Sequence, residues 1–162
     1  MCEANVYIPA EEVEAFLDAA LNGNTTEVST MLNRRWYLID VPSDDDDTAL
    51  MLATWNGNVD TVEMLCQHNA TTFATNHEDE NVFDQVSHLE EEKIGRLVNV
   101  LFQARNEEIS CWSDLKRQHN RVTYERNNKD GGVWCSFRME SGVSVHVAEA
   151  EGVDSNMMVR CP

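Results

Sequence analysis

The sequence predicts an α+β fold in which a short array of helix pairs is followed by a small antiparallel β-meander. Between residues 11 and 104, apolar side chains recur every three or four residues, which is the spacing of helices that bury one face. From residue 122 onward they alternate with polar side chains, which is the period of half-buried strands. We therefore divide the chain near residue 106 into a repeat domain, residues 1–106, and a second part, residues 107–162, with a connecting helix and a sheet.

Two helix pairs in the first half of the chain repeat one another. In the first pair, apolar residues at helical spacing run from Val13 to Ala20, and Gly23 follows as a stop signal. In the second pair, Thr48 is a candidate N-cap and Gly57 is the stop. The two glycines lie 34 residues apart, and a period in the low thirties is typical of stacked helical repeats. The same offset pairs Ala19 with Ala53, Asn22 with Asn56, Asn24 with Asn58, Val28 with Val62 and Met31 with Leu65.

The second pair carries a motif of known type. Thr48, Leu50 and Ala53 fit the pattern T-P-L-H-x-A, and Gly57 follows at the expected turn. Residues 48–70 therefore resemble an ankyrin repeat. The resemblance implies a short array (an α-solenoid) of three repeats, near residues 14–40, 46–76 and 79–104.

Two departures from the family pattern have physical meanings. Asn69 stands where the family usually has a left-handed Gly, and Asn is the next best residue for that conformation. In the third repeat, the acidic run Glu90-Glu91-Glu92 falls where the Gly turn belongs. We therefore expect the third helix pair to be irregular.

Acidic residues dominate the chain and are concentrated in the repeat domain. Residues 1–106 hold 20 acidic and 5 basic side chains, net −15, whereas residues 107–162 hold 9 and 7, net −2. This charge argues against bare nucleic acid and anionic membranes as partners, because both require clustered Lys and Arg. It favours a protein partner with a basic surface.

The sequence also predicts the compartment. No apolar run approaches the ~18 residues of a membrane span, and the first ten residues lack the pattern of a secretory signal. The five cysteines are scattered and odd in number, which is typical of reduced thiols. We therefore expect a cytoplasmic or nuclear protein.

The ankyrin resemblance implies where a partner docks, namely on the concave side that loop tips and the exposed ends of the first helices form. We expect Trp55 to be an exposed anchor, because Trp is enriched at binding hot spots; the alternative is a core aromatic. The acidic run has its own alternative, a solvated loop that only aids solubility. Carried over by position, the tips are Asp44, Asp45 and Asp47, then His77, Glu78 and Glu80, and the helix ends are Leu21 and Asn22, then Trp55 and Asn56.

The second part of the chain resembles no family known to us. Its period of two and its Gly- and Asn-rich breaks predict an antiparallel sheet. We expect the apolar face of this sheet to pack on the last repeat through Ile109, Trp112 and Leu115 of a connecting helix over residues 107–120. The expected strands lie near residues 122–126, 133–139, 143–150 and 157–161.

No catalytic or metal-binding motif stands out. The sequence contains no C-x-x-C pair, no G-x-x-x-x-G-K-[ST] and no G-x-G-x-x-G, so we expect no cofactor and no metal. These observations favour a non-catalytic protein–protein interaction module that binds a basic or basic–apolar segment. One alternative is an enzyme, or an enzyme's regulatory subunit, whose site in the sheet uses Cys135 or His146. Another is a structural protein that self-associates through a sheet edge; the oligomeric state stays open.

Overall fold

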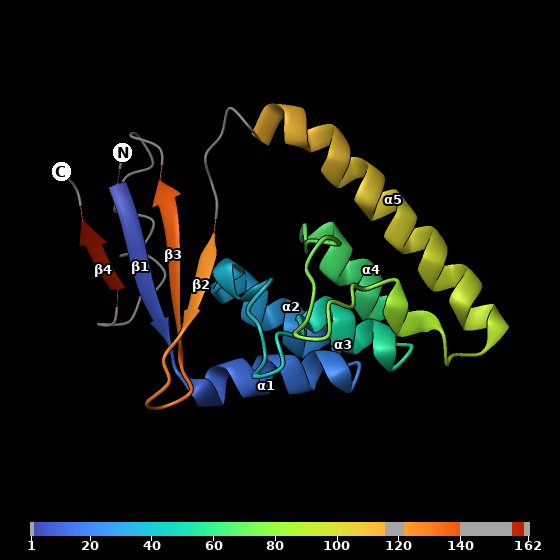
Figure 1. Ribbon diagram of the computed structural model, residues 1–162, viewed down its shortest axis with the longest axis horizontal. Helices are drawn as coiled ribbons and strands as arrows, with labels where there is room; N and C mark the ends of the chain where they lie inside the picture. Colours follow the sequence, from blue (N-terminus) through green and yellow to red (C-terminus); the bar gives the residue numbers. More distant parts are fainter. Residues whose placement is uncertain (1, 116–121, 140–156, 161–162) are drawn as a thin grey trace.

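The computed structural model describes residues 2–115, 122–139 and 157–160 of the 162 residues. It contains helical layers beside a four-stranded sheet (Figure 1). The helices are α1 (Ala10–Leu21), α2 (Thr25–Arg34), α3 (Ala49–Trp55), α4 (Val59–Gln67) and α5 (Glu91–Leu115), with single 3₁₀ turns η1 (Trp36–Leu38) and η2 (Asp84–Val86). The strands are β1 (Cys2–Ile8), β2 (Thr123–Arg126), β3 (Val133–Met139) and β4 (Met157–Arg160).

The helices form two layers, as stacked helix pairs do. The first helices of the two pairs, α1 and α3, pack side by side, and the second helices α2 and α4 form the other layer, which α5 extends. Between the layers lie fully buried apolar side chains, among them Phe16, Val28, Leu50 and Val62. Each pair buries its apolar face against the neighbouring pair, and these interfaces stabilise a repeat array.

The turns between the helices have the conformations that their residues predict. Gly23 and Gly57 have φ angles of 73° and 71°, in the left-handed region. Asn69 has a φ angle of 62°, so the substitution of Asn for Gly keeps the family's conformation. Thr48 is the N-cap of α3, and its Oγ1 accepts a hydrogen bond from the N–H of Met51 at 3.4 Å.

The third unit is irregular. The single turn η2 stands in place of a first helix, and the 25-residue α5 follows as the second. Leu97 and Leu101 of α5 are fully buried, and α5 packs against α4. Because α5 continues through residue 106, no break in secondary structure marks the expected boundary there, and the division into two domains stays a prediction.

The sheet is antiparallel, as expected, but it takes a central strand from the start of the chain. The strand order is β2-β3-β1-β4, so β1 lies between β3 and β4. The strands expected near residues 122–126, 133–139 and 157–161 are present as β2, β3 and β4, whereas the one expected at 143–150 lies outside the described residues. The described strands are therefore not a meander of consecutive segments.

The expected packing of the sheet on the last repeat is wrong. The ring of Phe137 in β3 stacks on Tyr37 and meets Trp36 edge-on, with centroids 6.2 and 5.0 Å apart. The hydroxyl of Tyr124 donates to the carbonyl oxygen of Tyr37 at 2.7 Å. Ile109 is 53% exposed, and the side chains of Trp112 and Leu115 are outside the described set. The sheet packs on the first pair because β1 leads directly into α1.

Sheet and helices share one apolar core. Ala4, Ile8 and Val133 of the sheet belong to the same buried cluster as Phe16 and Leu50 of the helices. Among the described residues, no helix combines the length and the hydropathy that crossing a bilayer requires.

Candidate functional site

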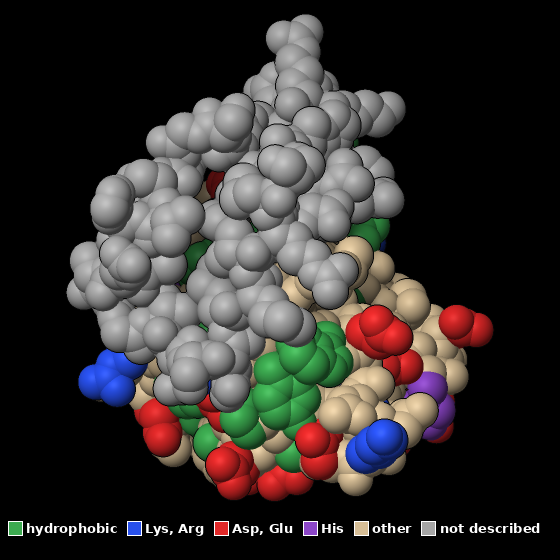
Figure 2. All heavy atoms as spheres, turned by 90° about the vertical axis from the view of Figure 1, so that its left-hand side faces the viewer, with side chains coloured by type: hydrophobic (Ala, Val, Ile, Leu, Met, Phe, Trp, Pro, Cys, Tyr) green, Lys and Arg blue, Asp and Glu red, His purple; other side chains and the backbone are tan. Residues whose placement is uncertain are grey.

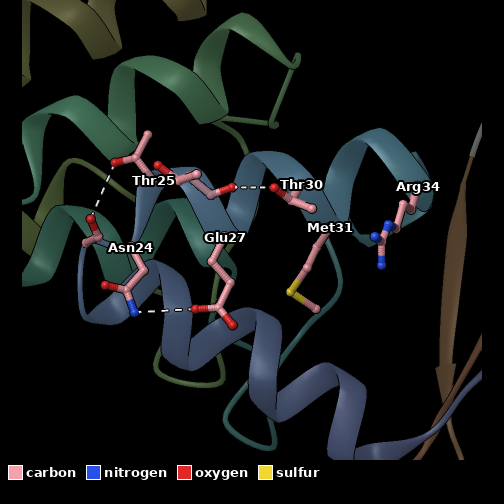
Figure 3. Close-up of a pocket in the computed structure, with 8 residues that line it drawn as sticks. Asn24, Thr25, Glu27, Thr30, Met31 and Arg34 are labelled. Carbon is pink, nitrogen blue, oxygen red and sulfur yellow. Dashed lines mark hydrogen bonds between the residues drawn. The ribbon is translucent and has the colours of Figure 1, made fainter.

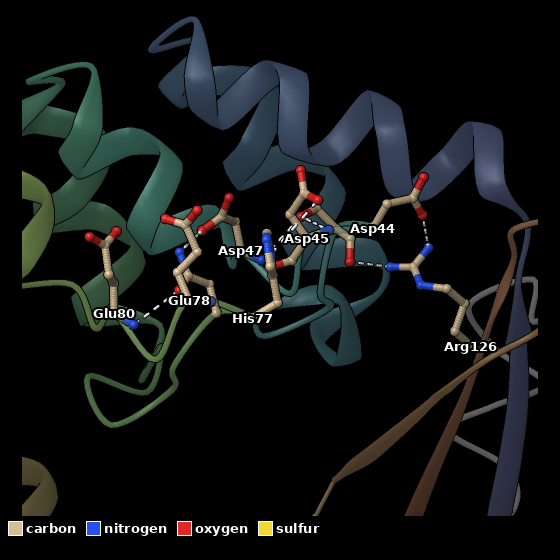
Figure 4. A network of polar contacts seen from close by, with 9 residues as sticks. Asp44, Asp45, Asp47, His77, Glu78, Glu80 and Arg126 are labelled. Atoms are coloured by element: carbon tan, nitrogen blue, oxygen red, sulfur yellow. Dashed lines mark hydrogen bonds and ion pairs between the residues drawn. The ribbon is translucent and has the colours of Figure 1, made fainter.

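Two loops that the sequence predicts as docking tips lie side by side (Figure 4). The side-chain amide of Asn76 donates to the Asp47 carboxylate at 3.0 Å. The backbone N–H of His77 donates to the carbonyl oxygen of Asp45 at 3.1 Å, and Nδ1 of the same residue lies 2.9 Å from that oxygen. The loops over residues 43–47 and 76–80 thus form one continuous edge.

Both loops have the same construction. In the first, Oγ of Ser43 accepts hydrogen bonds from the N–H groups of Asp45 and Asp47 at 3.2 and 3.0 Å. In the second, Oδ1 of Asn76 accepts from the N–H groups of Glu78 and Glu80 at 3.1 and 3.0 Å. Such side-chain turns hold a loop in one conformation. The fourth residue of each loop, Asp46 and Asp79, has a positive φ angle, 63° and 60°.

The acidic side chains of the two loops differ in their exposure to solvent and in their hydrogen bonds. The side chains of Asp44 and Asp45 are 88% and 72% exposed, and Glu78 is also exposed. Asp47 and Glu80 are partly buried, and Gln85 donates to the Glu80 carboxylate at 3.1 Å. Asp44, Asp45 and Glu78 therefore carry the most exposed carboxylates of the two tips.

His77 lies among these carboxylates. Its hydrogen bond to the Asp45 carbonyl raises the pKa of its imidazole, and the negative charges of Asp45, Glu78 and Asp47 raise the pKa further. His77 therefore keeps its proton to a higher pH than an ordinary histidine does. It would partly neutralise the loops as the pH falls.

Asp44 has a partner that the sequence did not indicate. The guanidinium of Arg126, at the end of β2, forms an ion pair with the Asp44 carboxylate. It also donates to the carbonyl oxygen of Pro42 at 2.9 Å and to that of Ser43. This contact joins segments more than eighty residues apart, and no local pattern in the sequence points to it.

The four residues predicted at the helix ends lie at the far end of the same layer. Asn22 is exposed, and its side-chain amide donates to the carbonyl oxygen of Asp18 at 2.8 Å. Asn56 is also exposed and donates to the carbonyl oxygen of the half-buried Leu21 at 2.7 Å. Trp55 is 49% exposed, as expected. It is separated from the loop tip at Asp47 by the length of α3, roughly 10 Å for seven residues.

The structure also shows an acidic stripe on α1, which is not among the residues predicted from the sequence. Glu11, Glu14 and Asp18 are all exposed. Their intervals of three and four residues place them on one face of the helix, opposite the buried Val13 and Phe16. That spacing was the signal that could have revealed them. Figure 2, which looks at the sheet end of the molecule, shows Asp and Glu side chains gathered along its lower edge.

A hollow on the other helical layer is a less suitable site. It runs along α2, encloses about 810 Å³, and is lined by polar side chains including Asn24, Glu27, Thr30 and Arg34 (Figure 3). Several of these groups bond within the helix: Asn24 to the Glu27 carboxylate at 3.4 Å, and Thr30 to the carbonyl of Thr26 at 2.8 Å. In the part of the chain that the structure describes, no three His, Cys, Asp or Glu side chains group as metal ligands do.

The cysteine of the rival enzyme hypothesis is placed unfavourably for chemistry. Cys135 is fully buried in β3, and burial raises the pKa of its thiol to about 12. A thiolate is therefore strongly disfavoured at neutral pH. The other residue of that hypothesis, His146, lies outside the described residues.

Comparison with known proteins agrees with the geometry of the helical layers. Residues 2–76 match the family model described as ankyrin repeats in three copies. This segment is an ankyrin-repeat array. The match covers the four helices α1 to α4 and the loop at residues 43–47, and it confirms the resemblance that the second pair carries. Ankyrin repeats are in general protein–protein interaction modules. No curated protein matches the chain.

Proposed function

We propose that this ankyrin-repeat protein is a non-catalytic interaction module that binds a basic or basic–apolar segment of another protein on an acidic face. The acidic face comprises the exposed side of α1, the two loops and the end of α3. The observation that carries the proposal is the exposed indole of Trp55 on the same helical layer as outward-facing carboxylates. The residues are Glu11, Glu14, Asp18, Leu21, Asn22, Asp44, Asp45, Asp47, Trp55, Asn56, His77, Glu78 and Glu80.

The charges and the indole have different roles in this proposal. Exposed carboxylates at the rim of an interface mainly steer the approach of a basic partner and make association sensitive to salt. A half-exposed Trp can bury a large apolar area once a partner covers it, so it contributes more of the affinity. Stacked repeats present such surfaces as extended concave faces, which suits a segment of several residues.

The charge also bears on the class of partner. Residues 1–106 carry a net charge of −15, which repels nucleic acid and anionic lipid and attracts Lys and Arg. We propose a protein partner for this reason. We further propose the cytoplasm or nucleus as its location, because Cys66 and Cys135 are free thiols in the structure, which is typical of a reducing compartment.

The test begins with a display library of peptides that combine Lys or Arg with Leu, Phe or Trp, selected against the full chain. The dissociation constant of the tightest peptide is then measured for the parent and for Trp55→Ala. Loss of an aromatic anchor is expected to weaken binding by about 30-fold or more, equivalent to ~2 kcal/mol. The matched control is Trp36→Ala, which removes an equally exposed indole (52%) on the sheet side.

A second pair of variants tests the carboxylates. Neutralising the stripe of α1 by Glu11→Gln, Glu14→Gln and Asp18→Asn should weaken the peptide and flatten the salt dependence of its binding. The control neutralises three exposed acids outside the proposed face, two Glu and one Asp, so that both triple variants have the same net charge. The proposal is wrong if no basic peptide is selected, or if all variants bind the peptide as tightly as the parent. The control substitutions are Asp60→Asn, Glu91→Gln and Glu92→Gln.

A further inference from the structure

The last carbonyl group of each first helix is capped by a side chain from the next unit. The carbonyl oxygen of Leu21, where α1 ends, accepts from the side-chain amide of Asn56 at 2.7 Å. The carbonyl oxygen of Trp55, where α3 ends, lies 2.8 Å from Nε2 of His88. Helix ends leave such carbonyl groups without partners inside the helix, so a side chain from outside satisfies them. His88 thus does for the second unit what Asn56 does for the first.

His88 also makes a ring contact, which the side chain of Asn56 cannot make. Its imidazole lies against the indole of Trp55, with ring centroids 3.9 Å apart and a tilt of 38° between the planes. Trp55 is nevertheless 49% exposed. The indole therefore has one side covered by His88 and much of its remaining surface free for a partner.

The position of His88 is itself fixed by its neighbours. It lies two residues after the buried Val86 of η2, and the N–H of the next residue, Leu89, donates to the Val86 carbonyl at 3.1 Å. A Cβ atom placed on Gly57, just after α3, would lie 3.3 Å from Cδ2 of Leu89 and 3.2 Å from Cδ of Lys93. The side chains of Leu89 and Lys93 thus lie over the turn at the end of α3, which keeps the neighbouring His88 beside Trp55.

We infer that His88 is a positioning residue for the binding anchor: its ring holds the Trp55 indole in one orientation and leaves the opposite side open to the partner. The effect of His88 on binding rests on the proposed function, whereas the contact between the two rings does not. An aromatic side chain that is already held in its bound orientation loses less conformational freedom when a partner covers it. Removing the ring of His88 should therefore weaken binding even though His88 need not touch the partner.

Two substitutions separate the ring contact from the hydrogen bond. His88→Asn keeps a side-chain donor for the Trp55 carbonyl, as Asn56 provides for Leu21, and removes the ring. His88→Phe keeps a ring against the indole and removes the donor. His68→Asn, an exposed histidine at the end of α4, is the control.

The first measurement needs no partner. The full chain is labelled with fluorotryptophan, and the fluorine NMR resonance of Trp55 is assigned by its loss in Trp55→Phe. In His88→Asn this resonance should move toward that of a solvent-exposed tryptophan and become narrower, whereas in His88→Phe and His68→Asn it should stay displaced. An unchanged Trp55 resonance in His88→Asn overturns the inference, whatever the outcome for binding.

The second measurement uses the selected basic–apolar peptide. His88→Asn should weaken its binding about 3- to 10-fold, and His88→Phe should bind within about twofold of the parent. If His88 acted only as a helix cap, the order would be reversed, with Asn neutral and Phe weak, and the inference would be wrong. If no peptide is selected at all, the proposed function fails while the fluorine spectra still decide the ring contact.

Discussion

The guanidinium of Arg126 in β2 forms an ion pair with the carboxylate of Asp44 in the loop over residues 43–47. The same group donates to the carbonyl oxygens of Pro42 and Ser43. A residue of the sheet thereby fixes the backbone of a loop in the repeat array. The sheet is thus part of the support of the acidic face, although it supplies none of the proposed binding residues.

Replacing Arg126 by Gln should lower the free energy of unfolding by about 1–2 kcal/mol, because several hydrogen bonds to a charged group are lost at once. Urea denaturation measures this change. Lys129→Gln, which removes the same charge from an exposed position in the turn after β2, should alter stability by less than ~0.5 kcal/mol. Equal effects of the two substitutions would mean that net charge, not the loop contact, is responsible.

A carboxyl group that is largely shielded from solvent, that of Asp40, makes stability depend on pH. Asp40 accepts a hydrogen bond from the N–H of Thr71 at 2.9 Å, and Glu108 accepts from the hydroxyl of Thr71 and the N–H of Thr72. Burial raises the pKa of Asp40 from 3.8 to about 6; the Thr71 hydrogen bond opposes this rise, and the charge of Glu108 adds to it. The folded chain therefore binds this proton more tightly than the unfolded chain does.

The sign of the effect follows from linkage. The stabilisation from protonated Asp40 is complete below pH 3.8 and is lost as the pH rises through about 6. Asp40→Asn keeps the acceptor for Thr71 without the charge, so it should be about 1–3 kcal/mol more stable than the parent at neutral pH and equal to it near pH 4. Denaturation at several pH values tests this, with the exposed Asp45→Asn as control. A variant that is less stable at neutral pH would contradict it.

Two glycines should respond in opposite directions to the same substitution. Gly57 has a φ angle of 71°, and an added Cβ would crowd Leu89 and Lys93, so Gly57→Ala should lower stability by about 1 kcal/mol or more. Gly95 lies inside α5, and outside its own helix backbone no atom lies within 4 Å of an added Cβ, so Gly95→Ala should raise stability by about 0.5–1 kcal/mol. Thermal unfolding distinguishes them, and a shared sign would disprove this account of the α3 terminus.

Local signals in the sequence predicted local structure well. The Thr48 cap, the Gly57 turn and the left-handed Asn69 each depend on a few neighbouring residues, and each was found as predicted. The pairing of β1 with β3 was not predicted. The paired residues are about 130 positions apart, and alternation within one short strand does not indicate which other strand it pairs with. The packing of the sheet was wrongly predicted for the same reason.

The residues of the candidate site also fall into two groups, those that could be predicted from the sequence and those that could not. The positions of the loop tips and the exposure of Trp55 followed from the repeat pattern, and the stripe of α1 could have followed from the spacing of its three acids. Arg126 and His88 could not be predicted, because each reaches the site from an irregular segment or another element. Such contacts depend on the tertiary fold and leave no periodic signal.

The central claim is that Trp55 anchors a basic–apolar segment whose approach the carboxylates steer. The most direct test is stopped-flow kinetics of the selected peptide with the parent and Trp55→Ala at low and high ionic strength. We predict that salt slows association of both chains alike, while Trp55→Ala raises the dissociation rate at least about tenfold at either ionic strength. An unchanged dissociation rate in Trp55→Ala, or association indifferent to salt, would contradict the claim.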